Sequence, residues 1–423
     1  MLEIIINESI LFNCRSYIVP EQHGFIPGRS VTTNLLEYTT FCIDNLAKGL
    51  QVDAIYTDLK AAFDRIDHSI ALKKLAKLGF TTRICQLLES YLRNNRTLQV
   101  KVETELSEEF TNPSGVPQGS NLGPILFALF FNDVAALFIG TCKLVYADDF
   151  KMFTVIESLA DCYVLQAKLE RFADWCSDNR MTLSVEKCVV ISFNRKISRE
   201  VFNFTYSLED HDLERVYCVK DLGVLLDAKL TFRNQQSTVV EKANRQLGFI
   251  AKIAKEFDNP LCLRSLYCAL VRSHLESPST VWAPYHQNWI NRIEGIQRKF
   301  VWYAVRNLRW ANPLNLLPYE ARCRLLGLTT LAKRREAAKA VLAAKILTSE
   351  TDAPNLLTSL NTVVHSRSLR PRPGFFHRPI DRSDFIRNAP LRSLCDAFNK
   401  FYHVFEFGES VASFQRKILN EVR

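Results

Sequence analysis

The chain has 423 residues, which is long for a single hydrophobic core and favours two or three packed units. Hydrophobic residues make up 47% and charged residues 23%, a balance that is typical of a folded protein and excludes a disordered one. Lys and Arg outnumber Asp and Glu by 54 to 45, which gives a formal charge of +9. This excess favours contact with a polyanion but does not establish it.

The 12 Cys residues are spread singly along the chain, without a C-x-x-C pair. This spacing argues against a zinc site or a disulfide framework and indicates reduced, mostly buried thiols. Residues 1–12 lack the basic start of a signal peptide. The most apolar run, 125–140, contains Asn132 and Asp133 and is too short and too polar to span a membrane. We therefore expect no membrane association and a location in the nucleus or the cytoplasm.

The first half of the chain alternates helical and strand patterns. The expected elements are helices within 2–45, broken by a turn-rich segment at 22–30; a strand at 52–59; a helix at 61–78, ended by Gly79; short strands at 97–104 and 109–112; a loop at 115–121 and a helix that starts at Pro124; a hairpin with strands 143–146 and 150–154; a helix at 159–179; a strand at 188–194; and two strands within 216–226. This order predicts an α+β unit in which helices cover one face of a mostly antiparallel sheet.

The second half is predicted to be helical as far as residue 347. Amphipathic patterns lie at 239–255, 261–275, 290–305 and 332–346. From residue 352 on, Pro and Arg become frequent, and we expect a basic tail of limited order. Its basic residues are Arg367, Arg370, Arg372, Arg378, Arg382, Arg387 and Arg392, opposed by Asp381 and Asp384.

Three carboxylates stand where a metal site could form. Asp58 lies at the end of a predicted strand, and Asp148 and Asp149 occupy the turn of a predicted hairpin. Phosphoryl transfer onto a growing strand uses two divalent cations about 4 Å apart, held by carboxylates on a rigid scaffold. Taken singly, the Asp pair is also ordinary turn chemistry, and Asp58 could be a helix N-cap.

The order of the surrounding segments carries a resemblance. Five segments resemble consecutive motifs of reverse transcriptases: 58–64 (DLKAAFD), 115–120 with 124–127 (GVPQGS and PILF), 146–149 (YADD), 179–187 (NRMTLSVEK) and 219–224 (VKDLGV). Other segments are similar to those of non-LTR retrotransposons of the jockey-like or related animal lineages. These are 22–25 with 29–30 (QHGF and RS), 274–276 with 281–282 (HLE and VW), 293–298 (IEGIQR) and 413–415 (SFQ).

The resemblance implies a right-hand polymerase fold and an RNA-directed DNA polymerase. Its domains would be partial fingers at 1–50, a palm with an antiparallel sheet at 51–234, an all-helical thumb at 235–347 and a basic C-terminal region at 348–423. The implied cofactor is Mg²⁺, as two ions, with Mn²⁺ as a substitute. The implied partners are an RNA template, a DNA primer and deoxynucleoside triphosphates.

The resemblance also assigns roles to single residues around the metals. Asp58 and Asp148 would bridge the two metal ions, and Asp149 would support them. Phe63 would pack under the sugar of the incoming nucleotide and exclude a 2′-hydroxyl, although it also suits a core position. Gln118 would contact the nucleotide or the template, although by itself it is a loop Gln.

Further roles are implied away from the carboxylates. Lys187 would donate a proton to the leaving pyrophosphate, or would simply be an exposed Lys before a strand; the family's usual next residue is Thr, and here it is Cys188. Arg29 would hold phosphate or template backbone, or would be a solvated loop residue. Leu222 and Gly223 would shape the turn that holds the primer.

The remaining polar residues receive structural or shared roles. Asp64, Asp67 and His68 are expected to stabilise their own helix or its contacts. Basic thumb residues would line a groove for an RNA–DNA duplex, although charged helix faces are usually just solvated. They are Lys242, Arg245, Lys252, Lys255, Arg292, Arg298 and Lys299.

The chain departs from the family at its beginning. Relatives carry further fingers strands and an endonuclease upstream, and the residues that grip the triphosphate lie there. An N-terminally truncated, catalytically inactive retroelement remnant that still binds nucleic acid is therefore the alternative to an active polymerase.

Overall fold

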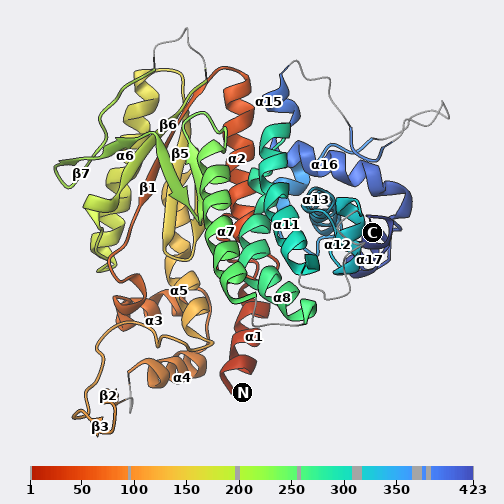
Figure 1. The fold of residues 1–423 in the computed structure, drawn as a ribbon. Coiled ribbons are helices and arrows are strands. Elements are labelled where there is room, and N and C mark those ends of the chain that lie inside the picture. The colour runs from red at the N-terminus through yellow and green to blue at the C-terminus, as the bar shows by residue number, and fades with distance from the viewer. Residues whose placement is uncertain are drawn as a thin grey trace. The chain divides into compact units, whose positions relative to one another are not determined.

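A computed structural model describes residues 2–93, 97–195, 201–254, 259–306, 317–363, 374–377 and 383–422. The chain divides into two compact units, each with its own set of elements (Figure 1). The first unit comprises Met1–Asn34 and Lys48–Tyr217, and the second comprises Leu35–Ala47 and Cys218–Arg423. The expected boundaries of fingers, palm, thumb and tail stay predictions, because compactness alone does not define those domains.

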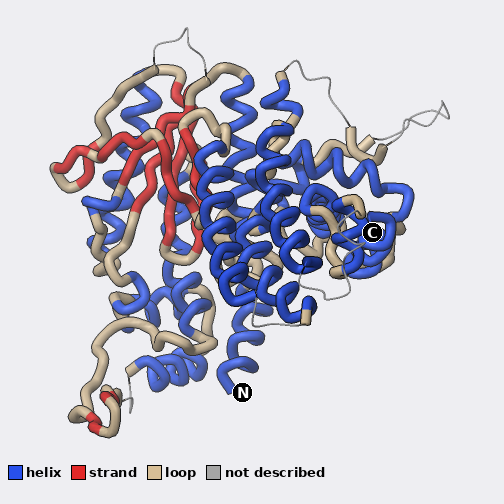
Figure 2. The backbone as a smooth tube through the Cα atoms, viewed as in Figure 1, coloured by secondary structure: helices blue, strands red, loops and turns tan. Residues whose placement is uncertain are grey.

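A five-stranded sheet forms the centre of the first unit (Figures 1 and 2). Its strands, in spatial order, are β4 (Cys142–Tyr146), β5 (Asp149–Ile156), β1 (Gln51–Thr57), β6 (Val189–Phe193) and β9 (Glu214–Val216). Neighbouring strands are antiparallel except for β6 and β9. The predicted α+β class with a mostly antiparallel sheet is confirmed.

Helices of this unit share one hydrophobic, largely aromatic core with the sheet. They are α1 (Leu2–Cys14), α3 (His68–Lys77), α4 (Thr82–Leu92), α5 (Gly123–Phe131), η2 (Asn132–Phe138) and α6 (Leu159–Asp178). Ile55, Phe150 and Met152 alternate along their strands with residues of the opposite face, as strand geometry requires, and join the helices in one core. The ring of Phe150 stacks on Phe172 of α6, with centroids 4.6 Å apart. This core holds β1 and β5 rigidly side by side.

One predicted helix in this unit is wrong in its first half. The structure has a short η1 turn (Ala62–Asp64) where the sequence predicted a helix from residue 61, and α3 begins only at His68. Ala61 adopts a left-handed conformation (φ 50°), which ends regular structure there. Asp67 then caps α3 by accepting a hydrogen bond from the Ile70 N–H at 3.0 Å.

Small hairpins complete the first unit. The segment that was predicted as strands 97–104 and 109–112 forms β2 (Lys101–Val102) and β3 (Glu105–Leu106), with a further bridge between Leu98 and Phe110. A second small hairpin pairs β7 (Ser207–Leu208) with β8 (His211–Asp212).

Among its described residues, the second unit is helical apart from the hairpin of β10 (Cys218–Asp221) and β11 (Val224–Asp227) and an isolated bridge between Thr362 and Phe376. Its helices include most of α2 (Val31–Ala47), then α7 (Arg233–Ile253), α8 (Pro260–Leu266), α9 (Ser273–Glu276), α10 (Ser279–Trp282), α11 (Gln287–Arg306), α12 (Tyr319–Leu325) and α13 (Leu331–Leu347). The predicted helical region is confirmed, with one refinement. The helix expected at 261–275 contains a π-helical stretch, Tyr267–Arg272.

The prediction of limited order beyond residue 352 is wrong for 390–422. There the chain forms α16 (Pro390–Phe401) and α17 (Val411–Val422), after the shorter α14 (Pro354–Ser359) and α15 (Asp384–Arg387). Leu394 and Phe398 are fully buried where α16 packs on α13, whose Ala340 and Ala344 allow close approach. Frequent Arg and Pro residues obscured this apolar i, i+4 spacing. Lys255, Arg367, Arg370, Arg372, Arg378, Asp381 and Arg382 lie outside the described residues.

Within the described ranges, no helix is long and apolar enough to cross a membrane.

Candidate active site

The three predicted carboxylates lie near the same end of β1 and β5. The β4–β5 hairpin closes with Tyr146 opposite Asp149, so Ala147 and Asp148 form a two-residue turn. The antiparallel register of β1 and β5 ends with Thr57 opposite Phe150, so Asp58 and Asp149 each adjoin this last pair. Asp58 and Asp148 are half-buried, and Asp149 is exposed. The sheet thus brings together residues that are 90 positions apart in sequence.

The hairpin turn is held by a loop from the N-terminal part of the unit. The side-chain oxygen of Gln22, which is 2% exposed, accepts hydrogen bonds from the N–H of Gly24 at 2.8 Å and of Ala147 at 3.3 Å. The His23 N–H donates to the Val145 carbonyl at 2.9 Å. Ala147 has a φ of 59°, which costs roughly 1–2 kcal/mol for a residue with a Cβ. The contacts from 22–24 hold the turn in that conformation.

Arg29 ties the same loop together. Its Nη1 donates to the carbonyl oxygens of Val19 at 2.7 Å, Pro20 at 3.2 Å and Gln22 at 2.7 Å. These bonds stabilise the segment that supports the turn, so Arg29 is more than a solvated loop residue. Its expected contact with phosphate or template stays a prediction.

Lys187 lies beside Asp58, as its expected role requires. Its Nζ is 3.3 Å from Asp58 Oδ2, and the two side chains are 66% and 38% exposed. The Ser184 N–H donates to the Asp58 carbonyl at 2.8 Å, and the Lys60 N–H donates to the Thr182 carbonyl at 2.8 Å. These backbone bonds fasten the segment 182–187 along the residues that follow β1.

Cys188 occupies the place where the family usually has Thr. Its side chain is buried, and its Sγ donates to the Ser184 carbonyl at 3.4 Å. Burial raises the pKa of the Cys188 thiol to about 11, so the thiol is neutral near pH 7. A Thr hydroxyl can donate to the same carbonyl, which gives the substitution a physical explanation.

Phe63 and Gln118 belong to two segments that meet at the break before α3. The loop with Gly115 and Val116 docks into that break, where the Val116 N–H donates to the Phe63 carbonyl at 2.9 Å. Gln118 Nε2 then donates to Asp64 Oδ1 at 3.1 Å. The Phe63 ring, half-buried, stacks on Phe127 with centroids 4.5 Å apart.

Asp67 and His68 have the structural roles that were predicted for them. Besides capping α3, Asp67 forms an ion pair with Arg180 at 2.7 Å. The buried His68 ring forms a hydrogen bond with the Gly115 carbonyl at 2.7 Å, which anchors the docked loop.

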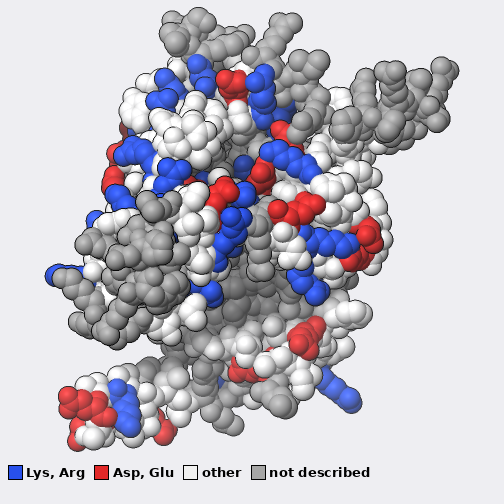
Figure 3. Space-filling view, turned by 45° about the vertical axis from the view of Figure 1, so that its right-hand side comes forward, with Lys and Arg blue, Asp and Glu red and all other residues white. Residues whose placement is uncertain are grey.

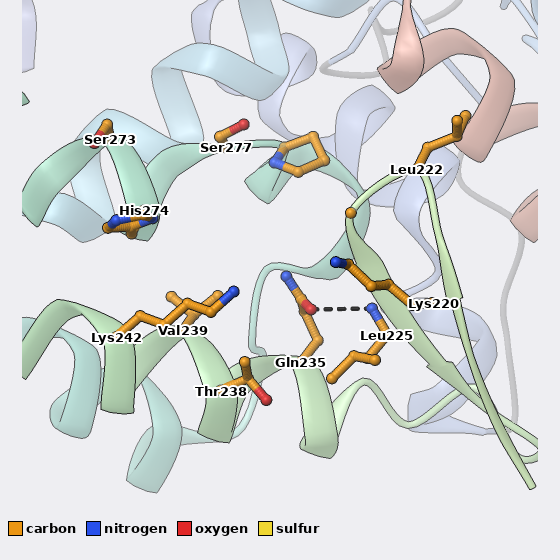
Figure 4. Close-up of a pocket in the computed structure, with 12 residues that line it drawn as sticks. Lys220, Leu222, Leu225, Gln235, Thr238, Val239, Lys242, Ser273, His274 and Ser277 are labelled. Atoms are coloured by element: carbon orange, nitrogen blue, oxygen red, sulfur yellow. Dashed lines mark hydrogen bonds between the residues drawn. The ribbon is translucent and has the colours of Figure 1, made fainter. Parts of the chain in front are cut away.

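In the second unit, Leu222 and Gly223 form the turn of the β10–β11 hairpin. Both have positive φ values, 45° and 88°, the pattern of a type I′ turn. The turn borders a pocket of about 300 Å³ that also touches α7 and α9. Figure 4 shows the ammonium groups of Lys220 and Lys242 directed into this pocket from opposite sides. The Leu225 N–H donates to Gln235 Oε1 at 3.0 Å, which fixes the hairpin to α7.

On the face seen in Figure 3, the described Lys and Arg side chains lie among Asp and Glu. Two of the basic residues predicted to line a duplex groove lie over aromatic rings: Arg292 lies over Trp289 at 4.5 Å, and Arg298 lies over Tyr319 at 5.0 Å.

The donor set at Asp58, Asp148 and Asp149 suits a hard divalent cation. Within the ranges that the structure describes, however, no group of three or more His, Cys, Asp or Glu side chains is arranged so that it could hold a metal ion by itself, and this includes the three carboxylates. Mg²⁺ usually binds through one or two carboxylates and completes its shell with water and substrate phosphates. Carboxylate oxygens at the ends of two adjacent rigid strands fit that mode of binding.

Two supporting residues were not recognised as such from the sequence. Gln22 and Gly24 belong to a segment that resembles a family motif, but nothing in their spacing indicated that they contact the turn at Ala147. The contact joins segments more than 120 residues apart, and no local pattern encodes it.

An Asp-bearing hairpin beside a strand that leads into Asp58, on a mostly antiparallel sheet with helices, is consistent with the right-hand polymerase fold. The chain belongs to the reverse transcriptase family, because the model of that family, described as reverse transcriptase (RNA-dependent DNA polymerase), matches residues 3–239. The resemblance drawn from the motifs is thereby confirmed.

Similar proteins identify the branch of the family. The chain is 27% identical over 320 residues to the RNA-directed DNA polymerase from mobile element jockey of Drosophila funebris, which covers 71% of this chain and 34% of that protein. It is 30% identical over 230 residues to the probable RNA-directed DNA polymerase from transposon BS of Drosophila melanogaster, covering 51% and 24%. These matches confirm a jockey-like, non-LTR type. The chain spans about a third of the length of the jockey relatives.

A solved structure of apo telomerase from Candida tropicalis shares 13% identity and a TM-score of 0.42, covering 72% of this chain and 50% of that one.

Proposed function

We propose that the chain is an RNA-directed DNA polymerase, which extends a DNA primer along an RNA template with deoxynucleoside triphosphates. The observation that carries this proposal is the strand register that ends with Thr57 opposite Phe150, which places Asp58 and Asp149 next to that pair and Asp148 in the adjoining hairpin turn. Asp58 and Asp148 would hold two Mg²⁺ ions, or Mn²⁺ in their place, and Asp149 would support the site. Such ions would activate the attacking oxygen and stabilise charge on the leaving group.

The protein's own contribution is to position these groups. The pairing of β1 with β5 fixes the backbone at Asp58 and Asp149. The hydrogen bond from the Ala147 N–H to Gln22 fixes the turn that carries Asp148. Positioning and electrostatics supply nearly all the catalysis of phosphoryl transfer, so a rigid sheet is a suitable scaffold.

Phe63 and Gln118 form the nucleotide side of the site. The stacking of Phe63 on the buried Phe127 ring fixes its orientation, which supports a role in excluding a 2′-hydroxyl. Gln118 is exposed and keeps its side-chain oxygen as an acceptor while its amide donates to Asp64. It contacts the incoming nucleotide or the template.

Lys187 acts as the general acid for the leaving pyrophosphate. Its ammonium is solvent-exposed and lies at a carboxylate of the metal site, where negative charge develops on the leaving group. Its ion pair with Asp58 supplies the orientation.

Leu222 and Gly223 hold the primer strand, and the lysines beside them contact its phosphates. Lys220 and Lys242 both line the pocket next to the turn. Phosphate contacts of this kind fix the position of a strand without reading its sequence. Arg29 and the described basic residues predicted to line the duplex groove contribute to holding template or duplex: Arg245, Lys252, Arg292, Arg298 and Lys299.

A primer-extension assay separates this function from that of an inactive remnant. The purified chain is supplied with an RNA template, an annealed DNA primer, the four deoxynucleoside triphosphates and Mg²⁺. Template-dependent extension that a chelator abolishes supports the proposal. Extension no greater than that of the Asp148→Asn variant leaves a remnant that at most binds nucleic acid.

A further inference from the structure

A second basic pocket lies in the helical unit, between α13, α15 and α16. It encloses about 390 Å³, at the lower end of the range of small-molecule pockets, about 300–1,000 Å³. Five basic residues line it against two acidic ones, Glu336 and Asp396. The basic residues are Lys333, Arg335, Lys339, Arg387 and Lys400.

Arg335 is the unusual member of this group. Its side chain is only 5% exposed, yet its guanidinium makes no hydrogen bond or ion pair with any described residue, and Nη1 is a buried donor without an acceptor. Buried hydrogen-bond donors nearly always have an acceptor, and a buried charged donor without one destabilises the folded state more than a neutral one does. Its neighbour Arg334 shows the ordinary arrangement, since both oxygens of Glu276 accept hydrogen bonds from that guanidinium.

The other basic residues of the pocket are paired with acids, except Lys339. Lys400 pairs with Glu336, Lys333 lies 3.9 Å from Glu320, and Arg387 bonds to Asp384 at 3.0 Å. Lys339, on the same helix as Arg335, makes no ion pair within the described part of the chain. Burial and the charge of Arg335 lower the pKa of Lys339 to about 8, which a bound anion would reverse.

We propose that this pocket binds a phosphate group, with Arg335 and Lys339 as its main ligands. A guanidinium offers paired donors that match phosphate oxygens, and an ammonium adds a point charge. Ser393 also lines the pocket and can donate its hydroxyl hydrogen. The phosphate belongs either to a polynucleotide backbone or to a free nucleotide or pyrophosphate. The site uses none of the residues of the proposed polymerase centre.

The test measures binding by titration calorimetry on the whole chain, in a chelator that removes divalent cations and so silences the carboxylate site. The probes are pyrophosphate and a 15-nucleotide single-stranded RNA. We expect one of them to bind, and Arg335→Met and Lys339→Met each to weaken that binding by about tenfold or more. The matched control Lys345→Met removes the same charge from α13 outside the pocket, and affinity should stay within about twofold. If Arg335→Met weakens binding of the RNA, a strand is the source of the phosphate; if it weakens binding of pyrophosphate only, the source is a free ligand.

Thermal unfolding excludes a trivial loss of fold. Arg335→Met removes a buried cation without a partner, so its melting temperature should be unchanged or higher. Failure of both probes to bind the wild type, or equal binding by Arg335→Met, overturns the proposal. Since no polymerisation is measured, and Asp148→Asn should bind like the wild type, the outcome is independent of the polymerase activity.

Discussion

A methyl group at Gly24 would lie 2.2 Å from the backbone nitrogen of Ala147, closer than any real contact of a Cβ. Gly24 is therefore the residue that lets the N-terminal loop approach the turn carrying Asp148. Because Ala147 also has a left-handed φ, the turn depends on this approach and on the Gln22 hydrogen bond.

Gly24→Ala is expected to displace the turn. Overpacking of this kind costs about 1–3 kcal/mol of unfolding free energy, and a shift near 1 Å at a catalytic group lowers a rate by about a hundredfold. Chemical denaturation and primer extension measure the two effects. The control is Gly248→Ala in α7, where a Cβ meets nothing within 4 Å; it should be stabilised by about 0.5–1 kcal/mol. Full activity in Gly24→Ala would show that the turn does not need this contact.

Phe63→Val is expected to admit ribonucleotides. Loss of the ring opens space beside the sugar, and the preference for deoxynucleotides over ribonucleotides should fall by about tenfold or more. Competition between the two triphosphates in single-nucleotide incorporation measures this ratio. Phe172→Leu alters a core ring that stacks on Phe150 instead, so it should lose stability while keeping the preference. An unchanged ratio in Phe63→Val would leave Phe63 with a packing role only.

Lys187→Met is expected to slow the chemical step. Loss of a general acid lowers kcat by about 10²–10⁴-fold, while KM for the nucleotide changes little. Single-turnover extension separates these quantities. Lys60→Met is the matched control, because Lys60 is 44% exposed and pairs with Glu186 at 3.5 Å instead of Asp58. Equal rates for the two variants would reduce Lys187 to a surface ion pair.

Stability is expected to fall at alkaline pH, in part through Cys188. Its pKa is raised from 9.0 to about 11 in the folded chain, so above pH 9 the unfolded chain loses this proton first. The raised pKa of Cys188 stabilises the folded chain fully below pH 9. About 1 kcal/mol of this stabilisation is lost by pH 10. Denaturation at pH 8 and pH 10 checks this, and Cys188→Thr should lose correspondingly less. A loss of equal size in both proteins would contradict the assigned pKa.

Local patterns were sufficient for the hairpin and the sheet. The short apolar strands on either side of Ala147 and Asp148 predicted β4 and β5, and motif order paired the hairpin with Asp58. The prediction of a helix from residue 61 is wrong before His68, because the apolar spacing of the sequence continues through the break that precedes α3. That break exists because the loop at Gly115 docks there from 50 residues away. Contacts of this kind, like that of Gln22 with Ala147, arise only in the folded chain.

The sequence was least informative near its C-terminal end. Arg and Pro content suggested a poorly ordered tail, whereas Leu394 and Phe398 are buried against the Ala-rich face of α13. The burial of Arg335 was likewise unpredictable, because a run of charged residues on a helix usually faces solvent.

The most direct test of the central claim compares RNA-templated primer extension by the wild type, Asp58→Asn, Asp148→Asn and Asp174→Asn at saturating Mg²⁺. Asp174 is an exposed Asp of α6 and controls for the loss of one charge. If Asp58 and Asp148 share one metal site, each variant loses at least about 10³-fold in rate, and Asp174→Asn matches the wild type. Wild-type rates in Asp58→Asn or Asp148→Asn would contradict that site.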